Sequence, residues 1–123
     1  MEHRTDSDRW AFIGGGVRDD ESLVAAMRRE VAEETGLDIE RFRLFGLFSD
    51  PSRIIAYGDG TTVSLLTAVF RAEVPAGAAT KMSEESQELR FVTPEELRAL
   101  TIAETHEPIR QRYLARPAEI FVD

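Results

Sequence analysis

The most informative segment of the chain runs from Gly15 to Leu37 and reads GGVRDDESLVAAMRREVAEETGL. Residues 22–35 predict a helix, and Gly36 follows at the place where helices often end in a left-handed residue. Gly14 and the two glycines after it separate this helix from a short apolar stretch. These glycines form either a tight turn or a place where the backbone approaches a ligand closely.

The predicted helix carries carboxylates on or beside the face that should be apolar. Its residues advance by about 100° each, so that Leu23, Met27 and Val31 define an apolar stripe. Relative to Leu23, the side chains of Glu30 and Glu34 fall within roughly 20° on either side. Both glutamates therefore lie on the inner stripe or at its edge, whereas an ordinary solvated charge run would lie opposite.

Three glutamates of this helix conflict with local preferences. Glu30 and Glu34 are like charges at i and i+4, and with Glu33 they crowd the C-terminal end, where the helix dipole disfavours anions. A divalent cation such as Mg²⁺ or Mn²⁺ resolves the conflict, because hard ions bind clustered carboxylates and share their remaining positions with phosphates. Arg29 lies one turn before Glu33, where it forms either an ordinary surface pair or a contact that orients the carboxylate.

The remaining chain shows no repeat, low-complexity segment or linker, which indicates one domain over residues 1–123. Strands are predicted at residues 10–13, 42–48, 53–57, 62–74 and 89–92, with a turn at 58–60. Helices are predicted from the capping box Thr93-Pro94-Glu95-Glu96 to about residue 100, and over residues 104–115 with a bend or restart at Pro108. This mixture of elements predicts an α/β or α+β sandwich.

The composition excludes several classes of protein. The chain has no cysteine, so disulfides and thiolate metal sites are excluded. No apolar run approaches the ~20 residues of a membrane span, and residues 1–8 lack the apolar stretch of a signal peptide. The net charge of −8, without a basic stripe, argues against a DNA- or RNA-binding module. We therefore expect a soluble, cytoplasmic protein, which needs a bound cation if its substrate is an anion.

The segment from Gly15 to Leu37 resembles the Nudix box, G-x5-E-x7-R-E-U-x-E-E-x-G-U, in which U is aliphatic. The fixed positions are matched at the required spacing by Gly15, Glu21, Arg29, Glu30, Val31, Glu33, Glu34, Gly36 and Leu37. Softer resemblance continues through Trp10 and residues 88–97, although Ile13 stands where relatives often have proline. The resemblance implies a Nudix-type α/β/α sandwich with a mixed β-sheet, and hydrolysis of a nucleoside diphosphate linked to a group X.

The resemblance also implies roles for the residues of the box. Glu30 and Glu34 correspond to the principal metal ligands, and Glu33 corresponds to a third ligand or a supporting acid. Gly15 corresponds to a residue whose carbonyl reaches the metal, which is expected to be Mg²⁺ or Mn²⁺. Arg29 corresponds to the residue that orients the glutamates. A further box position, Glu21, supports the loop–helix–loop.

The attacking water needs a general base, which in this family is a box glutamate or an acid from a distant loop. The loop at residues 83–88 offers three candidates, namely Glu84, Glu85 and Glu88. We favour Glu85, and the alternative is that this loop is merely solvated. The expected catalytic residues are therefore Arg29, Glu33 and Glu85.

The sequence leaves alternatives open for both the substrate and the activity. The box builds a metal site but does not select the group X, so ADP-ribose, nucleoside di- or triphosphates and nucleotide sugars remain candidates. The alternative function is a Nudix-fold sensor that binds a nucleotide without hydrolysing it. Sensors of this kind usually lose the glutamates of the box, and this chain keeps them.

Only nine residues precede Trp10, whereas relatives usually have one or two strands there. Residues 5–8 correspond to a hairpin turn, and residues 1–4 to the stub of a truncated N-terminal strand. A sheet edge left open in this way needs a cover. A partner subunit or residues 120–122 could provide it, or the chain is a piece of a longer one. We expect a homodimer, because closed two-fold pairing is the commonest arrangement.

Overall fold

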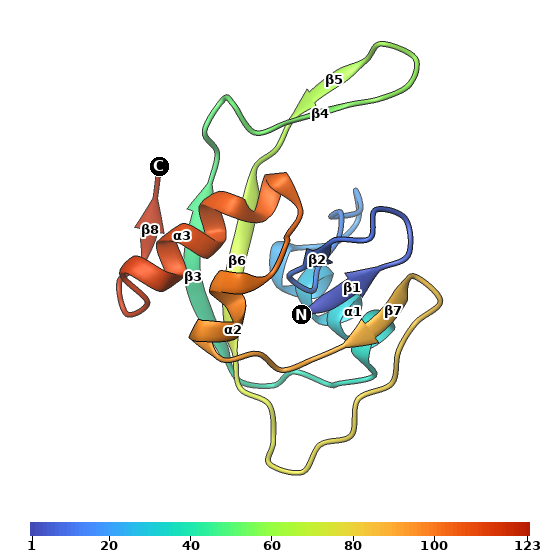
Figure 1. Cartoon of the computed structure of the whole chain (residues 1–123), viewed down its shortest axis with the longest axis vertical. Coiled ribbons are helices and arrows are strands. Elements are labelled where there is room, and N and C mark those ends of the chain that lie inside the picture. Colours follow the sequence, from blue (N-terminus) through green and yellow to red (C-terminus); the bar gives the residue numbers. More distant parts are fainter.

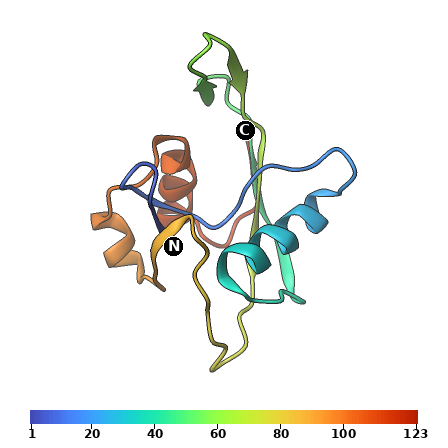
Figure 2. The ribbon, with the colours of Figure 1, turned by 90° about the vertical axis from the view of Figure 1, so that its right-hand side faces the viewer.

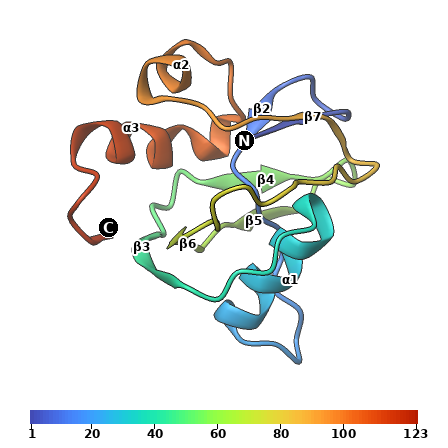
Figure 3. The same cartoon turned by 90° about the horizontal axis from the view of Figure 1, so that it is seen from below.

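The computed structural model describes residues 1–123 and shows helices on both sides of the strands. Helix α1 (Leu23–Thr35) lies on one side, and α2 (Pro94–Ala99) and α3 (Glu107–Ala115) lie on the other (Figures 2 and 3). A 3-10 turn, η1 (Glu104–His106), precedes α3 directly. The predicted α/β/α layering is therefore confirmed. No helix combines the length and apolar character that crossing a membrane requires.

The strands form two three-stranded sheets and a separate hairpin (Figure 1). The first sheet has the order β2-β1-β7 and contains β1 (Glu2–Arg4), β2 (Trp10–Ala11) and β7 (Ser86–Leu89). The second sheet is mixed, since β3 (Phe42–Phe48) runs antiparallel to β6 (Thr67–Ala72) and parallel to β8 (Phe121–Val122). The hairpin of β4 (Ile54–Ala56) and β5 (Thr62–Ser64) projects from the body of the protein.

Helix α1 begins and ends where its sequence predicts. The Ser22 side chain accepts a hydrogen bond from the Ala25 N–H at 3.1 Å, which closes the first turn. At the other end, Gly36 has a left-handed φ of 75°, and its N–H donates to the Ala32 carbonyl at 2.9 Å. Both ends are thereby fixed, so the glutamates of the last two turns project in defined directions.

The main buried cluster joins β3 to α3. Phe45 and Phe48 of β3 pack with Ile109 of α3. Half-buried side chains surround this cluster, namely Phe12, Val69, Tyr113 and Phe121. Gly46 allows β8 to come this close, because a Cβ at that position would lie 2.8 Å from the Phe121 carbonyl oxygen. The C-terminal strand is therefore part of the same packing unit as β3.

The N-terminal strand is short, but both of its edges are paired. Strand β1 is hydrogen-bonded to β2 on one side and to β7 on the other. The expected gap in the sheet is therefore covered by residues 86–89. The suggestion that residues 120–122 fill it is wrong, because Phe121 and Val122 pair with β3 instead.

Two strand predictions in the second half of the chain need correction. The strand predicted at residues 89–92 lies at Ser86–Leu89, where it pairs with β1. The strand predicted over residues 62–74 is interrupted between β5 and β6, because β5 pairs with β4 whereas β6 pairs with β3. In both places a partner distant in the chain sets the boundary, which local composition does not reveal.

The two C-terminal helices follow the prediction more closely. The Thr93 side chain accepts from the Glu96 N–H and the Glu96 carboxylate accepts from the Thr93 N–H, both at 3.2 Å, which confirms the capping box. The last helix restarts at Glu107 after η1, with Pro108 in its first turn. The predicted restart at the proline is therefore confirmed.

Candidate active site

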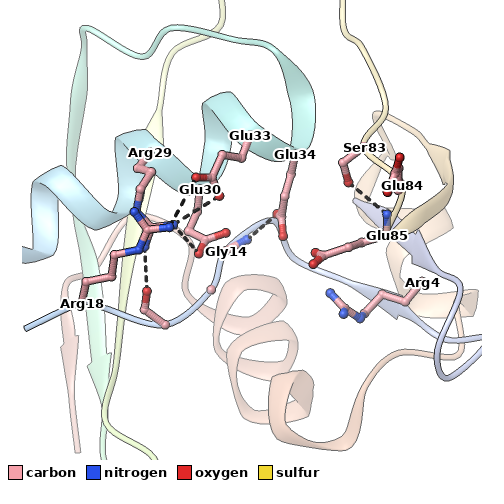
Figure 4. Close-up of a pocket in the computed structure, with 12 residues that line it drawn as sticks. Arg4, Gly14, Arg18, Arg29, Glu30, Glu33, Glu34, Ser83, Glu84 and Glu85 are labelled. Atoms are coloured by element: carbon pink, nitrogen blue, oxygen red, sulfur yellow. Dashed lines mark hydrogen bonds and ion pairs between the residues drawn. The ribbon is translucent and has the colours of Figure 1, made fainter.

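A cavity of about 590 Å³ lies where the glycine loop, α1 and the loop before β7 meet (Figure 4). It is lined by Arg4, Gly14, Gly15, Gly16, Arg18, Arg29, Glu30, Glu33, Glu34, Ser83, Glu84 and Glu85. None of these residues is hydrophobic, which indicates a cavity for a charged ligand rather than an apolar one. Every residue for which the sequence predicts a metal-binding or catalytic role lies in this lining.

Arg29 binds several acidic groups at once. Its guanidinium donates to Glu21 at 2.6 Å, Glu30 at 2.8 Å, the Gly16 carbonyl at 2.9 Å and Glu33 at 3.2 Å. The hydrogen bonds from Arg29 lower the pKa of Glu21 to about 2. The pair with Glu33 expected from the helical spacing is present, but three of the hydrogen bonds go to Glu21. Arg29 thus connects the loop before α1 to the acidic end of that helix.

Glu34 is the buried acid of the helix, with 3% of its surface exposed. Its carboxylate accepts a hydrogen bond from the Gly14 N–H at 3.0 Å. Burial and, after it, the negative charge of Glu2 raise the pKa of Glu34 to about 8. The hydrogen bond from Gly14 therefore compensates a negative charge at this position only in part.

Three carboxylates from separate parts of the chain converge at this point. Glu2, Glu34 and Glu85 offer oxygen atoms that all lie within 4.8 Å of one another. Clustered carboxylate oxygens are the donors that a hard divalent cation such as Mg²⁺ prefers. Glu34 is a buried carboxylate with a raised pKa, and a cation bound at its oxygen atoms would stabilise its charged form. The residues present thus fit a divalent metal ion.

Glu30 lies in the same cavity as Glu34 but has different neighbours. Its carboxylate accepts from Arg29 and lies directly against Gly15, where a Cβ would come within 2.3 Å of the carboxyl carbon. Helix α1 therefore presents both glutamates to one cavity, as the helical angle predicts. The tightest carboxylate cluster, however, contains Glu34 and not Glu30.

The contact between Gly15 and Glu30 gives a testable prediction. In Gly15→Ala, the new methyl group displaces the Glu30 carboxylate, while the fold persists because the end of a side chain can move. We expect Mn²⁺ affinity and kcat each to fall by about tenfold. Gly16→Ala is the matched control, because no atom lies within 4 Å of a Cβ there. Titration calorimetry and steady-state kinetics measure both variants, and equal effects in the two would contradict this role of Gly15.

The loop before β7 presents Glu85 to the cavity. Its backbone carbonyl accepts from the Thr5 N–H at 3.1 Å and from the Thr5 hydroxyl at 3.2 Å, so the loop is tied to the N-terminal hairpin. Of the other two candidate bases, Glu84 also lines the cavity. Glu88 lies on β7, is absent from the lining and pairs with Arg90 at 3.0 Å. The structure therefore leaves Glu84 and Glu85 near the box glutamates.

Sequence reasoning missed three charged residues of the site, namely Glu2, Arg4 and Arg18. Arg4 and Arg18 come from different parts of the chain and flank the acidic residues in Figure 4. Side chains two apart in a strand share a face, which puts Glu2 on the same face as Arg4. The sequence predicts that Glu2 and Arg4 share a face of the strand. That this face points towards the box glutamates depends on the pairing of β1 with β7.

The chain was compared with known proteins. The sequence profile described as the NUDIX domain matches residues 1–113. A nucleoside triphosphatase NudI from Enterobacter sp. (strain 638) is 34% identical over 100 residues, which cover 78% of this chain and 70% of that protein. A nucleoside triphosphatase NudI from Escherichia coli O139:H28 is 36% identical over 95 residues. That match covers 72% of this chain and 64% of the E. coli protein.

Solved structures share the fold. The mutator protein MutT from Bacillus halodurans has a TM-score of 0.70 at 24% identity, over 98% of this chain and 79% of that one. The Nudix hydrolase RenU from M. smegmatis has a TM-score of 0.65 at 24% identity, over 90% of this chain and 69% of that one. These similarities show that the arrangement of helices and strands is shared. The chemistry of the site depends on the residues that line the cavity.

Proposed function

Because the chain belongs to the NUDIX domain family of pyrophosphohydrolases, we propose that it hydrolyses a nucleoside triphosphate or a similar nucleoside diphosphate derivative with Mg²⁺ or Mn²⁺. The observation that carries this proposal is the cavity lined only by charged, polar and glycine residues, among them five carboxylates and three arginines. Hydrolysis of a pyrophosphate needs both a cation at its oxygens and a carboxylate that can act as a base near the attacking water. The names of the similar NudI proteins support a nucleotide as the substrate.

The metal ligands in this proposal are Glu30, Glu33 and Glu34, with the carbonyl of Gly15. When bound there, the cation neutralises pyrophosphate charge and lowers the pKa of a water molecule. Arg29 fixes the directions of Glu30 and Glu33 through its hydrogen bonds at 2.8 and 3.2 Å. It acts through these carboxylates, so its role is to position them.

The two remaining arginines of the lining supply positive charge for the substrate. Arg18 approaches Glu33 at 3.8 Å, and 63% of its side chain is exposed, so it is free to turn towards a phosphate. Arg4 lies on the opposite side of the cavity, near Glu85 (Figure 4). An anionic substrate thus meets cationic side chains on two sides of an otherwise acidic cavity.

Glu85 is the general base in this proposal. It is the exposed member of the cluster with Glu2 and Glu34, which are both buried. An exposed carboxylate beside the buried ones can take a proton from the attacking water and release it to solvent. Glu84 lines the same cavity but does not belong to this cluster.

Glu85→Gln is therefore expected to lower kcat by at least about tenfold, and Glu84→Gln by much less. The effect is moderate because a metal-bound water is already acidic. The two variants remove the same charge from adjacent positions, so each serves as the control for the other. Steady-state kinetics at saturating Mg²⁺ measure the difference, and equal, mild effects would assign the base to another group.

A panel of nucleotides tests the proposed function itself. The protein is incubated with Mg²⁺ and nucleoside triphosphates, nucleoside diphosphates, ADP-ribose and nucleotide sugars, and the products are separated by chromatography. We expect turnover of at least one nucleotide, with cleavage at a pyrophosphate bond. Tight binding without any product would instead support the alternative, a nucleotide sensor.

We further propose that the protein associates as a homodimer through the β4–β5 hairpin. The two strands pair only with each other, and exposed apolar side chains lie on or beside them, namely Ile54, Tyr57, Val63 and Leu66. An isolated two-stranded hairpin is marginally stable, and its apolar side chains favour a partner surface. Light scattering tests this proposal: we expect a dimer for the wild type and a monomer for Tyr57→Ser/Leu66→Ser. A monomeric wild type would contradict it.

A further inference from the structure

Glu2 is a buried carboxylate outside the box. It lies on β1, and none of its surface is exposed. One carboxylate oxygen, Oε1, accepts a hydrogen bond from the Ser86 hydroxyl at 2.7 Å. The other oxygen, Oε2, is buried and has no hydrogen-bond partner. An unpaired oxygen of a buried carboxylate is strongly unfavourable unless another charge or hydrogen bond compensates it.

The nearest cation provides only part of that compensation, as an ion pair without a hydrogen bond. The Arg4 guanidinium lies 3.6 Å from Glu2 Oε2, which is beyond hydrogen-bonding distance. Arg4 instead donates two hydrogen bonds to Asp6, each at 3.0 Å. Glu34 and Glu85 add two more carboxylates, and one oxygen atom from each of the three glutamates lies within 4.8 Å of the others. The cluster thus holds more negative charge than the protein around it balances.

A purely structural role does not account for this arrangement. The hydrogen bond from Ser86 joins β1 to β7, and one neutral acceptor such as a glutamine oxygen would suffice for it. Apart from the ion pair with Arg4 at 3.6 Å, the second oxygen of Glu2 adds desolvation and repulsion from the neighbouring acids. Both are reversed if a divalent cation occupies the point to which the three carboxylates converge.

We propose that Glu2 is an additional ligand of the divalent cation, which its Oε2 atom binds from β1 while Glu34 binds from α1. This inference rests on the proposed function for the presence of the cation. Glu85, the exposed acid, remains next to this pair as the base. The metal site then joins α1 to the first sheet, and its ligands extend beyond the helix that carries the box.

Metal binding without turnover tests this role. Mn²⁺ affinity is measured by titration calorimetry on the full chain for the wild type, Glu2→Gln and Glu88→Gln. We expect Glu2→Gln to bind Mn²⁺ at least about tenfold more weakly. Glu88 is a matched control, because it lies on the paired strand β7 opposite His3 and has a half-exposed side chain. Wild-type affinity in Glu2→Gln overturns the inference.

A second measurement avoids the substitution altogether. The carboxyl carbon of Glu2 in the wild-type protein is followed by ¹³C NMR during a Mg²⁺ titration. Its signal is expected to shift with the same midpoint as that of Glu34. An unmoved Glu2 signal, while that of Glu34 shifts, overturns the inference even if Glu2→Gln fails to fold.

Failure of this inference is distinguishable from failure of the proposed function. Weaker Mn²⁺ binding in Glu34→Gln together with wild-type binding in Glu2→Gln overturns the role of Glu2 and leaves the proposed function standing. Weaker binding in Glu2→Gln without hydrolysis of any nucleotide supports the role of Glu2 and contradicts the proposed function.

Discussion

Excess EDTA is expected to abolish hydrolysis completely, and added Mg²⁺ or Mn²⁺ is expected to restore it. The lining of the cavity includes five carboxylates and three arginines, in a chain whose net charge is −8. One of these arginines, Arg29, is already held by Glu21 and Glu30. Without a cation, the phosphates of a nucleotide therefore meet net repulsion, and the water that Glu85 deprotonates keeps its ordinary high pKa.

The measurement is a phosphate- or nucleotide-release assay before and after chelation. EDTA that has been saturated with Mg²⁺ is the control, because this sample has the same ionic strength as the one with free EDTA and the same direct effect of the chelator on the protein. We expect this control to leave the rate unchanged. Undiminished hydrolysis in excess free EDTA would exclude a metal-dependent mechanism.

The second large effect is expected for Glu34→Gln, which should lower kcat by roughly 10²-fold or more. Glutamine preserves the shape of this buried side chain and can still accept the hydrogen bond from the Gly14 N–H. The substitution thus removes charge from the cluster without opening a cavity, so the domain stays folded. Asp38→Asn is the control, because it removes an exposed charge that pairs with Arg28 just beyond the same helix end. A near-normal rate in Glu34→Gln would show that the metal lies elsewhere.

The same variant is expected to change how stability depends on pH when metal is absent. In the folded protein the pKa of Glu34 is about 8, above the ordinary value of 4.5 that applies to the unfolded chain. Folding therefore retains a proton that the unfolded chain releases. The free energy of unfolding falls as the pH rises from 4.5 through 8, since the folded state must then bury a charged group. Thermal unfolding in EDTA at several pH values should show this decline in the wild type and a smaller one in Glu34→Gln.

Local signals in the sequence were sufficient for α1. Ser22 and Gly36 define its ends through contacts within four residues, and the helical angle brings Glu30 and Glu34 to one side. The same holds for the capping box at Thr93, whose two hydrogen bonds join residues three apart. Features that depend on neighbours in the sequence could therefore be predicted with correct boundaries.

Strand boundaries and the wider site depended on distant partners. Nothing local distinguishes a strand at residues 86–89 from one at 89–92, and the pairing with β1 decides between them. The pairing of β1 with β7 also places Glu2 beside the box glutamates. The sequence alone indicated only the stub of a strand at residues 1–4. Glu85 could be favoured over Glu84 from the sequence, but the observation that separates the two, the cluster of Glu85 with Glu2 and Glu34, depends on the folded chain.

The pairing of β1 with β7 also has a consequence for folding kinetics. Glu2 and Ser86 are separated by 84 residues, and contacts so distant in sequence form late because closing the intervening loop is entropically unfavourable. Helix α1 can form early, yet the cluster of Glu2, Glu34 and Glu85 is complete only when the first sheet has assembled. A cation that binds only the completed cluster should slow unfolding and leave the refolding rate almost unchanged.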